Sequence, residues 1–165
     1  MKTSPPLKTP QASKITIAQL MHPEHANNLG NVHGGWIMKL VDEAGALACM
    51  RHCQRRVVTV FMDQMEFHQP IRIGDLVTLT AEVTFTGRTS IEAKVDVVAE
   101  DPTTGDQVHT NTAYIVYVAL DDNRVPTQVP AIQASTPEEQ IMLEEGKKRQ
   151  AERLARRKNI SGGTE

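Results

Sequence analysis

Aromatic side chains are scarce in this sequence, because Phe, Trp and Tyr account for only 4% of its 165 residues. Proteins that bind single-stranded nucleic acid stack the bases on such rings, so the sequence offers little material for a base-stacking surface. A strong excess of one charge is missing as well, since the formal net charge is −2. The overall charge therefore gives no argument for a phosphate-binding face, and we expect no nucleic-acid partner.

Long apolar runs are also missing from the sequence. No stretch reaches the ~20 apolar residues that a membrane-spanning helix needs. The first residues, Met1-Lys2-Thr3-Ser4-Pro5-Pro6, lack the apolar core of a secretory signal peptide. We therefore expect a cytoplasmic protein without a membrane partner, and its length fits one domain with a core of normal size.

Only two cysteines are present, Cys49 and Cys53, with His52 between them. They fall in a predicted helix, where a disulfide between positions i and i+4 has poor geometry. No second group of ligands with the usual short spacing accompanies them, so the sequence does not predict a metal site. We expect buried or partly buried thiols.

The most informative stretch is a glycine-bearing loop, Gly30-Asn31-Val32-His33-Gly34-Gly35, that leads directly into an apolar segment. The spacing of the apolar residues in that segment predicts a helix over about residues 34–52. Glycines let a backbone approach a ligand closely, and the first N–H groups of a helix are free to bind an electron-rich oxygen. The loop and the helix start therefore form a candidate binding site.

One carboxylate, Asp42, lies inside this predicted helix. Its sequence neighbours Leu40, Val41 and Ala44 are apolar, so the helix cannot easily turn the carboxylate fully into water. An oxyanion-binding loop next to a half-buried carboxylate has the groups needed to hydrolyse an acyl group.

The rest of the chain shows the patterns of β-strands. The expected strands cover residues 13–21, 57–67, 77–86, 91–99 and 107–120. The clearest is the third, in which Val77, Leu79 and Ala81 alternate with polar residues, as in a half-buried strand. Long antiparallel strands joined by short turns, together with one apolar helix, favour an α+β fold in which a single sheet wraps around that helix.

The two ends of the chain are expected to lie outside this single domain, which we place at residues 13–132. Residues 1–12 contain three prolines and little apolar content, and they predict a disordered arm. Residues 133–165 predict a charged helix and tail, because Thr136-Pro137-Glu138-Glu139 combines a cap, a proline at the first helical position and a capping-box glutamate. The basic run at 147–158 is expected to be mostly a solvated helix face rather than a phosphate-binding surface.

This order of loop, helix and strands resembles the hot-dog-fold acyl-CoA thioesterases over roughly residues 15–158. The chain is most similar to the group that holds the bacterial short- to medium-chain acyl-CoA hydrolases and the tandem-domain cytosolic acyl-CoA hydrolases of animals. Besides the glycine-bearing loop, the motifs that carry the resemblance are Met38-Lys39-Leu40-Val41-Asp42-Glu43-Ala44-Gly45, Arg51-His52-Cys53, Val57-Val58-Thr59-Val60, Phe67-His68-Gln69-Pro70-Ile71, Ile73-Gly74-Asp75, Thr84-Phe85-Thr86-Gly87-Arg88-Thr89-Ser90 and Glu144-Glu145-Gly146-Lys147-Lys148-Arg149.

The resemblance implies an antiparallel sheet curled around the long helix, and a homodimer whose two sheets join into one. Such dimers commonly assemble further, often as a trimer of dimers. Their active sites lie at the dimer interface and bind an acyl-CoA thioester. No cofactor is implied, because CoA is part of the substrate and product.

The resemblance also assigns roles to individual residues. Asn31 matches the family's loop asparagine, expected to orient water or the carbonyl, and Asp42 matches its helix carboxylate. Asp42 is expected to act either as a general base or as a nucleophile that forms an anhydride, and the sequence does not separate these routes. The backbone N–H groups near Gly34 and Gly35 are expected to polarise the thioester oxygen.

The nucleotide end of CoA is expected to meet Arg88, Thr89 and Ser90 through charge and hydrogen-bond donors, although a plain hairpin turn suits these residues nearly as well. His33 is treated as a loop residue that lines the site, and Asp63 is assigned to structure or to an interface.

Two other functions are weighed against hydrolysis. A non-catalytic hot-dog module that senses acyl-CoA would be expected to carry a DNA-binding segment, for which the N-terminal arm is too short. A hydratase or dehydratase on the same fold would be expected to use a catalytic His or an Asp/His pair in a different loop context. Since the fold alone does not decide between these functions, the site residues must.

Overall fold

The computed structural model describes residues 7–63, 65 and 67–161 of the chain. Its elements, in chain order, are α1 (Pro10–Ser13), β1 (Ile15–Leu20), the 3-10 helix η1 (Pro23–His25), α2 (Gly34–Cys53), β2 (Arg56–Met62), β3 (Leu76–Thr86), β4 (Ser90–Glu100), β5 (Gln107–Leu120) and α3 (Pro137–Ser161).

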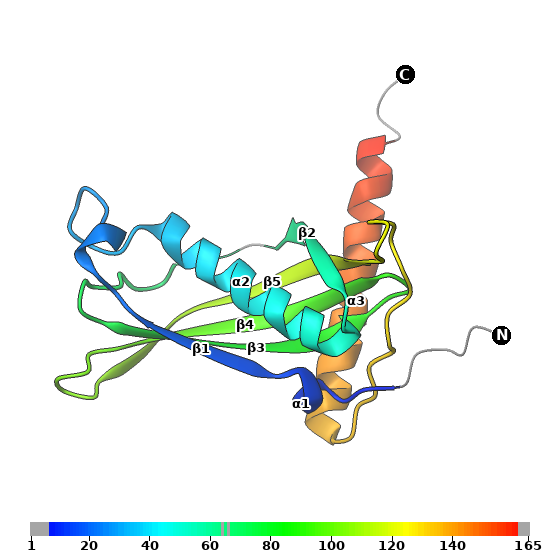
Figure 1. Ribbon diagram of the computed structural model, residues 1–165, viewed down its shortest axis with the longest axis horizontal. Coiled ribbons are helices and arrows are strands. Elements are labelled where there is room, and N and C mark those ends of the chain that lie inside the picture. Colours follow the sequence, from blue (N-terminus) through cyan, green and yellow to red (C-terminus); the bar gives the residue numbers. More distant parts are fainter. Residues whose placement is uncertain (1–6, 64, 66, 162–165) are drawn as a thin grey trace.

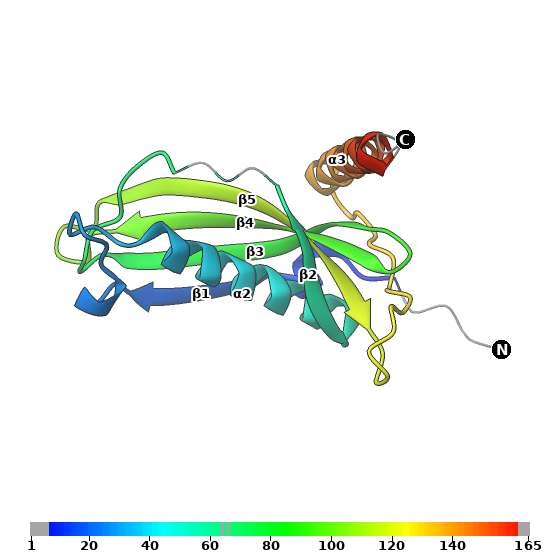
Figure 2. The ribbon, with the colours of Figure 1, turned by 90° about the horizontal axis from the view of Figure 1, so that it is seen from above.

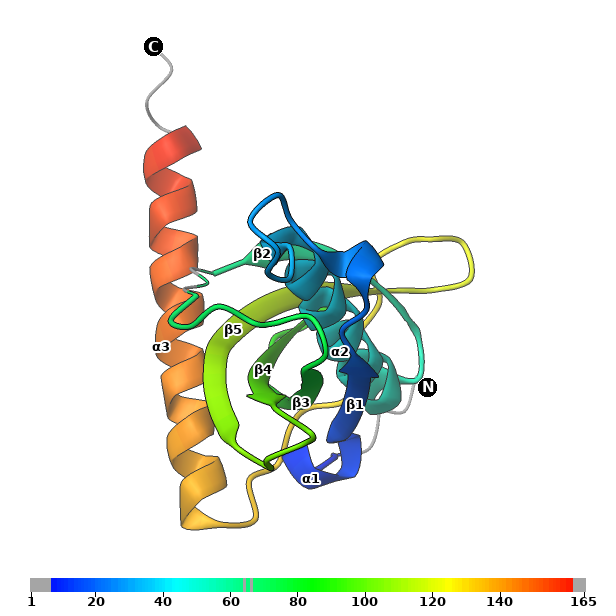
Figure 3. The same cartoon turned by 90° about the vertical axis from the view of Figure 1, so that its left-hand side faces the viewer.

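The five strands form one antiparallel sheet in the order β1-β3-β4-β5-β2, so that β1 and β2 are its edges. The sheet curls around α2, which lies along its concave face (Figures 1 and 3). Helix α3 lies on the opposite, convex side (Figure 2). The predicted fold, an antiparallel sheet wrapped around one long helix with an additional C-terminal helix, is confirmed.

The hydrophobic core lies between α2 and the concave face of the sheet. Alternate residues of β3 and β4, such as Val77, Leu79 and Val95, are fully buried there against Val41 and Ala44 of α2. The alternation in sequence is thus the alternation of two sheet faces, with one face toward the helix. Among the described residues, no helix has the length and apolar character needed to cross a lipid bilayer.

Helix α3 begins as its sequence predicts. The Thr136 hydroxyl accepts a hydrogen bond from the Glu139 N–H (3.2 Å), and the Glu139 carboxylate accepts one from the Ser135 N–H (2.6 Å). The expectation of a solvated basic face holds for Lys147 and Lys148, which are exposed. Two arginines of the same run, Arg149 and Arg153, instead turn toward the sheet and form ion pairs there.

Residues 7–12 do not form the disordered arm that was expected. The Lys8 N–H donates to the Ala131 carbonyl (3.1 Å), and the Lys8 carbonyl accepts from the Gln133 N–H (2.8 Å). Thr9 then caps α1, whose Pro10 is buried. This proline stands at the start of a helix, where its fixed φ favours helix and its missing N–H costs nothing. Residues 1–6 of the expected arm lie outside the described residues.

The strand expected over residues 57–67 ends at Met62. Its register against β5 shifts between Thr59 and Phe61, as at a β-bulge. Beyond Met62 the chain still follows β5, but with sparse bonds from the Asp63 N–H to the Tyr114 carbonyl (2.9 Å) and from the His68 N–H to the Thr110 carbonyl (3.3 Å). Positions 64 and 66 of the expected strand lie outside the described residues.

Candidate active site

The carboxylate of Asp42 is held by two hydroxyl groups from the sheet. Asp42 lies half-buried on α2, eight residues after the helix begins at Gly34. The Thr59 hydroxyl of β2 donates a 2.7 Å hydrogen bond to Asp42 Oδ1. The Tyr117 hydroxyl of β5 lies 3.2 Å from the same oxygen and 2.8 Å from the Asp42 backbone carbonyl. Oδ1 thus accepts the Thr59 hydroxyl proton and shares the single Tyr117 hydroxyl proton with the Asp42 backbone carbonyl.

Tyr117 can take this position because a glycine faces it. A Cβ atom at Gly45 would lie 2.5 Å from the Tyr117 hydroxyl oxygen, so only glycine admits the ring this close to α2. Burial, and then the charge of Asp42, raises the pKa of Tyr117 far above its ordinary value. The phenol therefore stays protonated and serves as a hydrogen-bond donor.

Thr59 is a functional candidate that the sequence analysis did not single out. It appears there only inside the run Val57-Val58-Thr59-Val60, and its contact with Asp42 depends on the curl of the sheet toward α2. The available signal was a hydroxyl residue in the middle of an otherwise apolar strand segment.

The loop that carries Asn31 is held by hydrogen bonds from its own residue Asn27. The Asn27 side-chain oxygen accepts hydrogen bonds from the N–H groups of Leu29 (2.8 Å) and Asn31 (3.2 Å), and the Asn27 N–H donates to the Asn31 carbonyl (2.7 Å). Gly30 adopts a φ of +82°, which favours glycine. Asn31 lines a pocket of about 250 Å³, whose wall also includes Gly34, Ile37, Phe67 and Ile71.

The start of α2 is only partly open to a ligand. The Nδ1 atom of His33, the N-cap residue, accepts the Gly35 N–H at 2.9 Å. An oxyanion at the Gly35 N–H would therefore have to displace His33. Gly34 lines the Asn31 pocket, and a Cβ atom at this position would lie 3.5 Å from the Phe67 ring. Of the two glycines named as oxyanion donors, Gly34 is thus placed in the pocket and Gly35 is engaged by the cap.

A single chain does not bring Asn31 and Asp42 together. Eight residues of helix correspond to a rise of about 12 Å, so Asp42 lies about that far along α2 from the loop that holds Asn31. Asp42 contacts β2 and β5, and it is absent from the residues described as lining the Asn31 pocket.

Arg88 and Thr89 lie in the hairpin turn between β3 and β4, and Ser90 is the first residue of β4. The Gly87 N–H donates to the Ser90 carbonyl (2.9 Å), so a hairpin turn is present here. The Thr89 and Arg88 carbonyls accept hydrogen bonds from the Ala119 N–H (3.0 Å) and the Val129 N–H (3.1 Å), while the Arg88 side chain is exposed. Ser90 precedes Ile91, which pairs with Tyr117, so the hairpin borders the part of the sheet that contacts Asp42.

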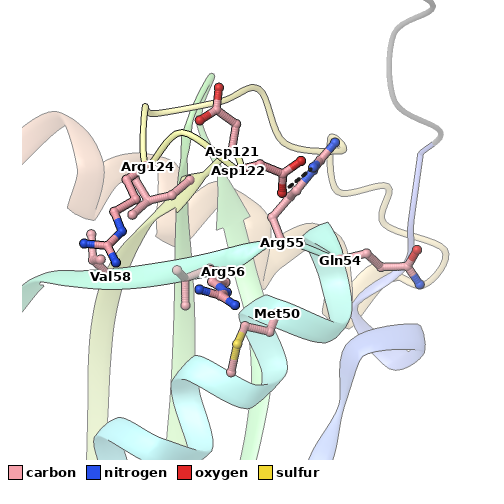
Figure 4. A pocket seen from close by; sticks show the side chains of 10 residues that line it. Met50, Gln54, Arg55, Arg56, Val58, Asp121, Asp122 and Arg124 are labelled. Atoms are coloured by element: carbon pink, nitrogen blue, oxygen red, sulfur yellow. Dashed lines mark ion pairs between the residues drawn. The ribbon is translucent and has the colours of Figure 1, made fainter.

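A larger pocket of about 860 Å³ lies beyond the C-terminal end of α2. Three arginines, Arg55, Arg56 and Arg124, and two aspartates, Asp121 and Asp122, line it, and Arg55 pairs with Asp122 at 3.9 Å (Figure 4). Its wall also includes Leu120, which follows the Ala119 that is bonded to the hairpin. Guanidinium groups bind phosphates well, so this end of the sheet has the chemistry to hold an anionic group.

The described part of the chain contains no group of three or more His, Cys, Asp or Glu side chains placed to hold a metal ion. Cys49 and Cys53 are free and buried, as predicted, and burial raises the pKa of the Cys49 thiol well above its ordinary value. The buried His52 ring lies 2.9 Å from the Ser13 hydroxyl and 2.9 Å from the Pro130 carbonyl, so it joins three segments of the fold.

Known proteins are similar to this chain in sequence and in architecture. A family model described as "Thioesterase superfamily" matches residues 29–105. The chain is 37% identical over 151 residues to the cytosolic acyl coenzyme A thioester hydrolase of Mus musculus, with 86% of this chain and 39% of the mouse protein covered. It is also 37% identical over 131 residues to an uncharacterized acyl-CoA thioester hydrolase of Bacillus subtilis, with 79% of this chain and 76% of that protein covered. The chain thus spans about two fifths of the mouse relative and about three quarters of the bacterial one.

Solved structures agree over nearly the whole chain. A hexameric acyl-CoA thioesterase in its apo form superposes with a TM-score of 0.87 at 32% identity, covering 92% of this chain and 97% of the other. An acyl-CoA hydrolase from Staphylococcus aureus, in complex with butyryl coenzyme A, coenzyme A and coenzyme A disulfide, superposes with a TM-score of 0.86 at 29% identity, covering 94% and 95%. Other structures of that enzyme carry alanine in place of an aspartate, an asparagine or a threonine.

Proposed function

Because the chain belongs to the hot-dog-fold acyl-CoA thioester hydrolases of the thioesterase superfamily, we propose that it hydrolyses acyl-CoA thioesters to a free acid and CoA. One observation carries the proposal beyond family membership. The half-buried carboxylate of Asp42 is oriented by the hydroxyls of Thr59 and Tyr117. Two of these residue types, aspartate and threonine, are also among those replaced by alanine in structures of the S. aureus enzyme.

The orientation of Asp42 suits general-base catalysis. Both hydroxyls bind Oδ1, and none of the described contacts of this side chain involves Oδ2. Oδ2 can therefore bind water. Oδ2 takes a proton from a water molecule while the water oxygen attacks the thioester carbonyl carbon. The resulting oxyanion collapses, the C–S bond breaks, and the CoA thiolate leaves and takes up a proton. In the alternative route, Oδ2 itself attacks the carbonyl, the C–S bond breaks and the CoA thiolate leaves and takes up a proton, and water then hydrolyses the resulting anhydride to the free acid and the Asp42 carboxylate.

Asn31 and the N–H of Gly34 are proposed to bind the thioester carbonyl, because both line the same pocket at the start of a helix. The Gly35 N–H can bind the carbonyl as well only after its hydrogen bond to His33 Nδ1 is broken. Since Asp42 of the same chain lies about 12 Å farther along α2, the carboxylate that serves this pocket is proposed to come from a second subunit. We propose that these side chains and backbone groups carry out the reaction, with CoA as part of the substrate and product rather than as a cofactor.

The edge of the sheet supports a homodimer. Within the described part of the chain, strand β2 pairs with β5 alone, and its Val58, Val60 and Phe61 are exposed, as are Met38 and Leu47 of α2. An unpaired edge strand beside exposed apolar groups is typical of a surface that a second chain covers. Hexameric relatives make a trimer of such dimers the assembly that we propose.

The nucleotide end of CoA is proposed to bind at the β3–β4 hairpin, at Arg88, Thr89 and Ser90. The adjacent arginine-lined pocket adds further groups that bind phosphate. A cytoplasmic location, as the name of the mouse relative indicates for that protein, completes the proposal.

Release of free thiol from a series of acyl-CoA substrates, measured with a thiol reagent, tests the proposal. The Asp42→Asn variant keeps the shape of the side chain but loses the base, and its rate should fall about 10²–10⁴-fold with unchanged folding. Thiol release at more than about half the wild-type rate would contradict the role of Asp42. Acyl-CoA binding without turnover would favour a sensing module, and loss of enoyl-CoA absorbance without thiol release would favour a hydratase.

A further inference from the structure

A buried ion-pair cluster joins α3 to the convex face of the sheet. Its centre is Glu92 of β4, whose side chain is only 1% exposed. Glu92 pairs with Arg149 at 2.8 Å and with Arg153 at 2.6 Å, and it accepts a 2.7 Å hydrogen bond from the Thr84 hydroxyl. Arg153 also pairs with Asp63 at 2.8 Å. The more exposed Arg156 also lies 3.6 Å from Asp63, so two carboxylates face three guanidinium groups.

Arg153 is the member that connects two different strands. Its side chain is 8% exposed and its two terminal nitrogens have separate partners: Nη1 binds Asp63 and Nη2 binds Glu92. A lysine offers one point charge in place of this fork and cannot hold the two carboxylates in the same way.

Asp63 stands at a weakly supported part of the sheet. It directly follows Met62, the last residue of the edge strand β2, which pairs only with β5 and has a register shift between Thr59 and Phe61. The Asp63 N–H donates to the Tyr114 carbonyl (2.9 Å), and the ion pair with Arg153 adds a second tether at the same point.

The cluster and the candidate catalytic carboxylate lie on adjacent rows of the sheet. Thr59, Tyr117 and Ile91 form one row across β2, β5 and β4, while Phe61, Val116 and Glu92 form the next. The side chains of Thr59 and Tyr117 contact Asp42 of α2, whereas Glu92 contacts Arg149 and Arg153 of α3. Helices α2 and α3 lie on the concave and convex faces of the sheet (Figures 2 and 3). A shift of β2 at Asp63 would therefore move Thr59, four residues away, relative to Asp42.

We propose that Arg153 is a positioning residue for hydrolysis, acting through Asp63 to hold β2 so that the Thr59 hydroxyl stays on Asp42 Oδ1. This inference rests on the proposed thioesterase function. It gives α3, which lies on the other side of the sheet from the reacting groups, a role in the rate of the chemical step rather than in substrate binding.

Steady-state kinetics of Arg153→Met against Arg156→Gln test the proposal. Arg156 is the matched control, because it lies on the same helix and faces Asp63 at 3.6 Å, but it is 62% exposed. We expect Arg153→Met to lower kcat by several-fold and by no more than about tenfold, the loss expected when the Thr59 hydroxyl is removed altogether, with KM within about twofold of wild type. Arg156→Gln should leave both constants unchanged.

A double-mutant cycle with Thr59→Val separates positioning from general support. If Arg153 acts through Thr59, adding Arg153→Met to Thr59→Val should lower kcat by less than about twofold further. Equal effects of Arg153→Met in both backgrounds, or a lower melting temperature with unchanged kcat, would show that the cluster only fastens α3 and would overturn the proposal. Should Arg153→Met fail to fold, Asp63→Asn removes the same ion pair while keeping nearly the same side-chain shape. The same changes in kcat and KM are then expected.

Amide hydrogen exchange gives a readout that does not need activity. Exchange in β2 should accelerate in Arg153→Met and stay at the wild-type rate in Arg156→Gln. A wild-type protein that releases no thiol would refute the proposed function while this measurement still tests the tether. Unchanged exchange in β2 would refute the tether itself.

Discussion

Removal of the Thr59 hydroxyl should reduce catalysis without reducing stability. Valine has almost the shape of threonine and keeps the β-branched form that suits a strand, so Thr59→Val deletes little more than the donor to Asp42 Oδ1. Because Thr59 is exposed, the loss of its hydroxyl should change the free energy of unfolding by no more than about 0.5 kcal/mol.

The size of the kinetic effect follows from the contact. Misplacing a catalytic group by about 1 Å can lower the rate on the order of 100-fold, and losing one of the two hydroxyls that orient Asp42 is a smaller perturbation. About 1.4 kcal/mol corresponds to a tenfold change in rate, so we expect kcat/KM to fall about tenfold. Tyr117 still binds Asp42 Oδ1 in the variant, which limits the loss.

The assay is thiol release with one acyl-CoA substrate across a range of concentrations. Thr112→Val is the matched control, because the Thr112 hydroxyl donates a bond of the same 2.7 Å length to Asp96, a carboxylate with no part in the proposed site. If Thr59→Val kept kcat/KM within about twofold of wild type, or if Thr112→Val lost as much, the hydroxyl would not be orienting a catalytic carboxylate.

Three further outcomes are expected. Burial lowers the pKa of His52, against the opposing effect of the Pro130 carbonyl, so this side chain should protonate in the unfolded chain first as the pH falls below about 6.5. The free energy of unfolding, measured with denaturant, should then fall by up to about 1.4 kcal/mol per pH unit. The His52→Gln variant should show a smaller slope. Gly45→Ala should push the Tyr117 ring away from α2, costing about 1–3 kcal/mol of stability together with activity; an unchanged melting temperature would contradict the close approach. Sedimentation at micromolar concentration should show species larger than the 18.3 kDa monomer, because a second chain is expected to cover the edge strand β2. A monomer as the sole species would contradict this.

The features that could be predicted from the sequence are those set by local periodicity. The alternation at Val77, Leu79 and Ala81 fixes which face of β3 is buried, and the helical spacing from Gly34 onward predicts α2 to within one residue at its end. The Thr136 cap likewise depends on neighbours three residues away. Each of these signals lies within a few residues of the feature that it predicts.

The features that could not be predicted depend on contacts between distant parts of the chain. Thr59 reaches Asp42 only because the sheet curls, and Arg153 reaches Glu92 only because α3 packs on the convex face. In the sequence, Arg153 is one more basic residue of an exposed helix. The segment around Pro10 differs from its prediction for a similar reason. The proline-rich composition of residues 1–12 suggests disorder, but Lys8 pairs with the segment after β5, and Pro10 lies in α1.

Subunit exchange tests most directly that each active site hydrolyses thioesters with Asn31 of one chain and Asp42 of another. Asn31→Ala and Asp42→Ala homodimers should each be nearly inactive. Mixed under conditions of proven exchange, they should form heterodimers in which one site holds both intact residues and the other holds neither. Two-fold symmetry then predicts up to about half of the wild-type thiol release per heterodimer. Complete exchange with no recovery of activity would contradict the shared site.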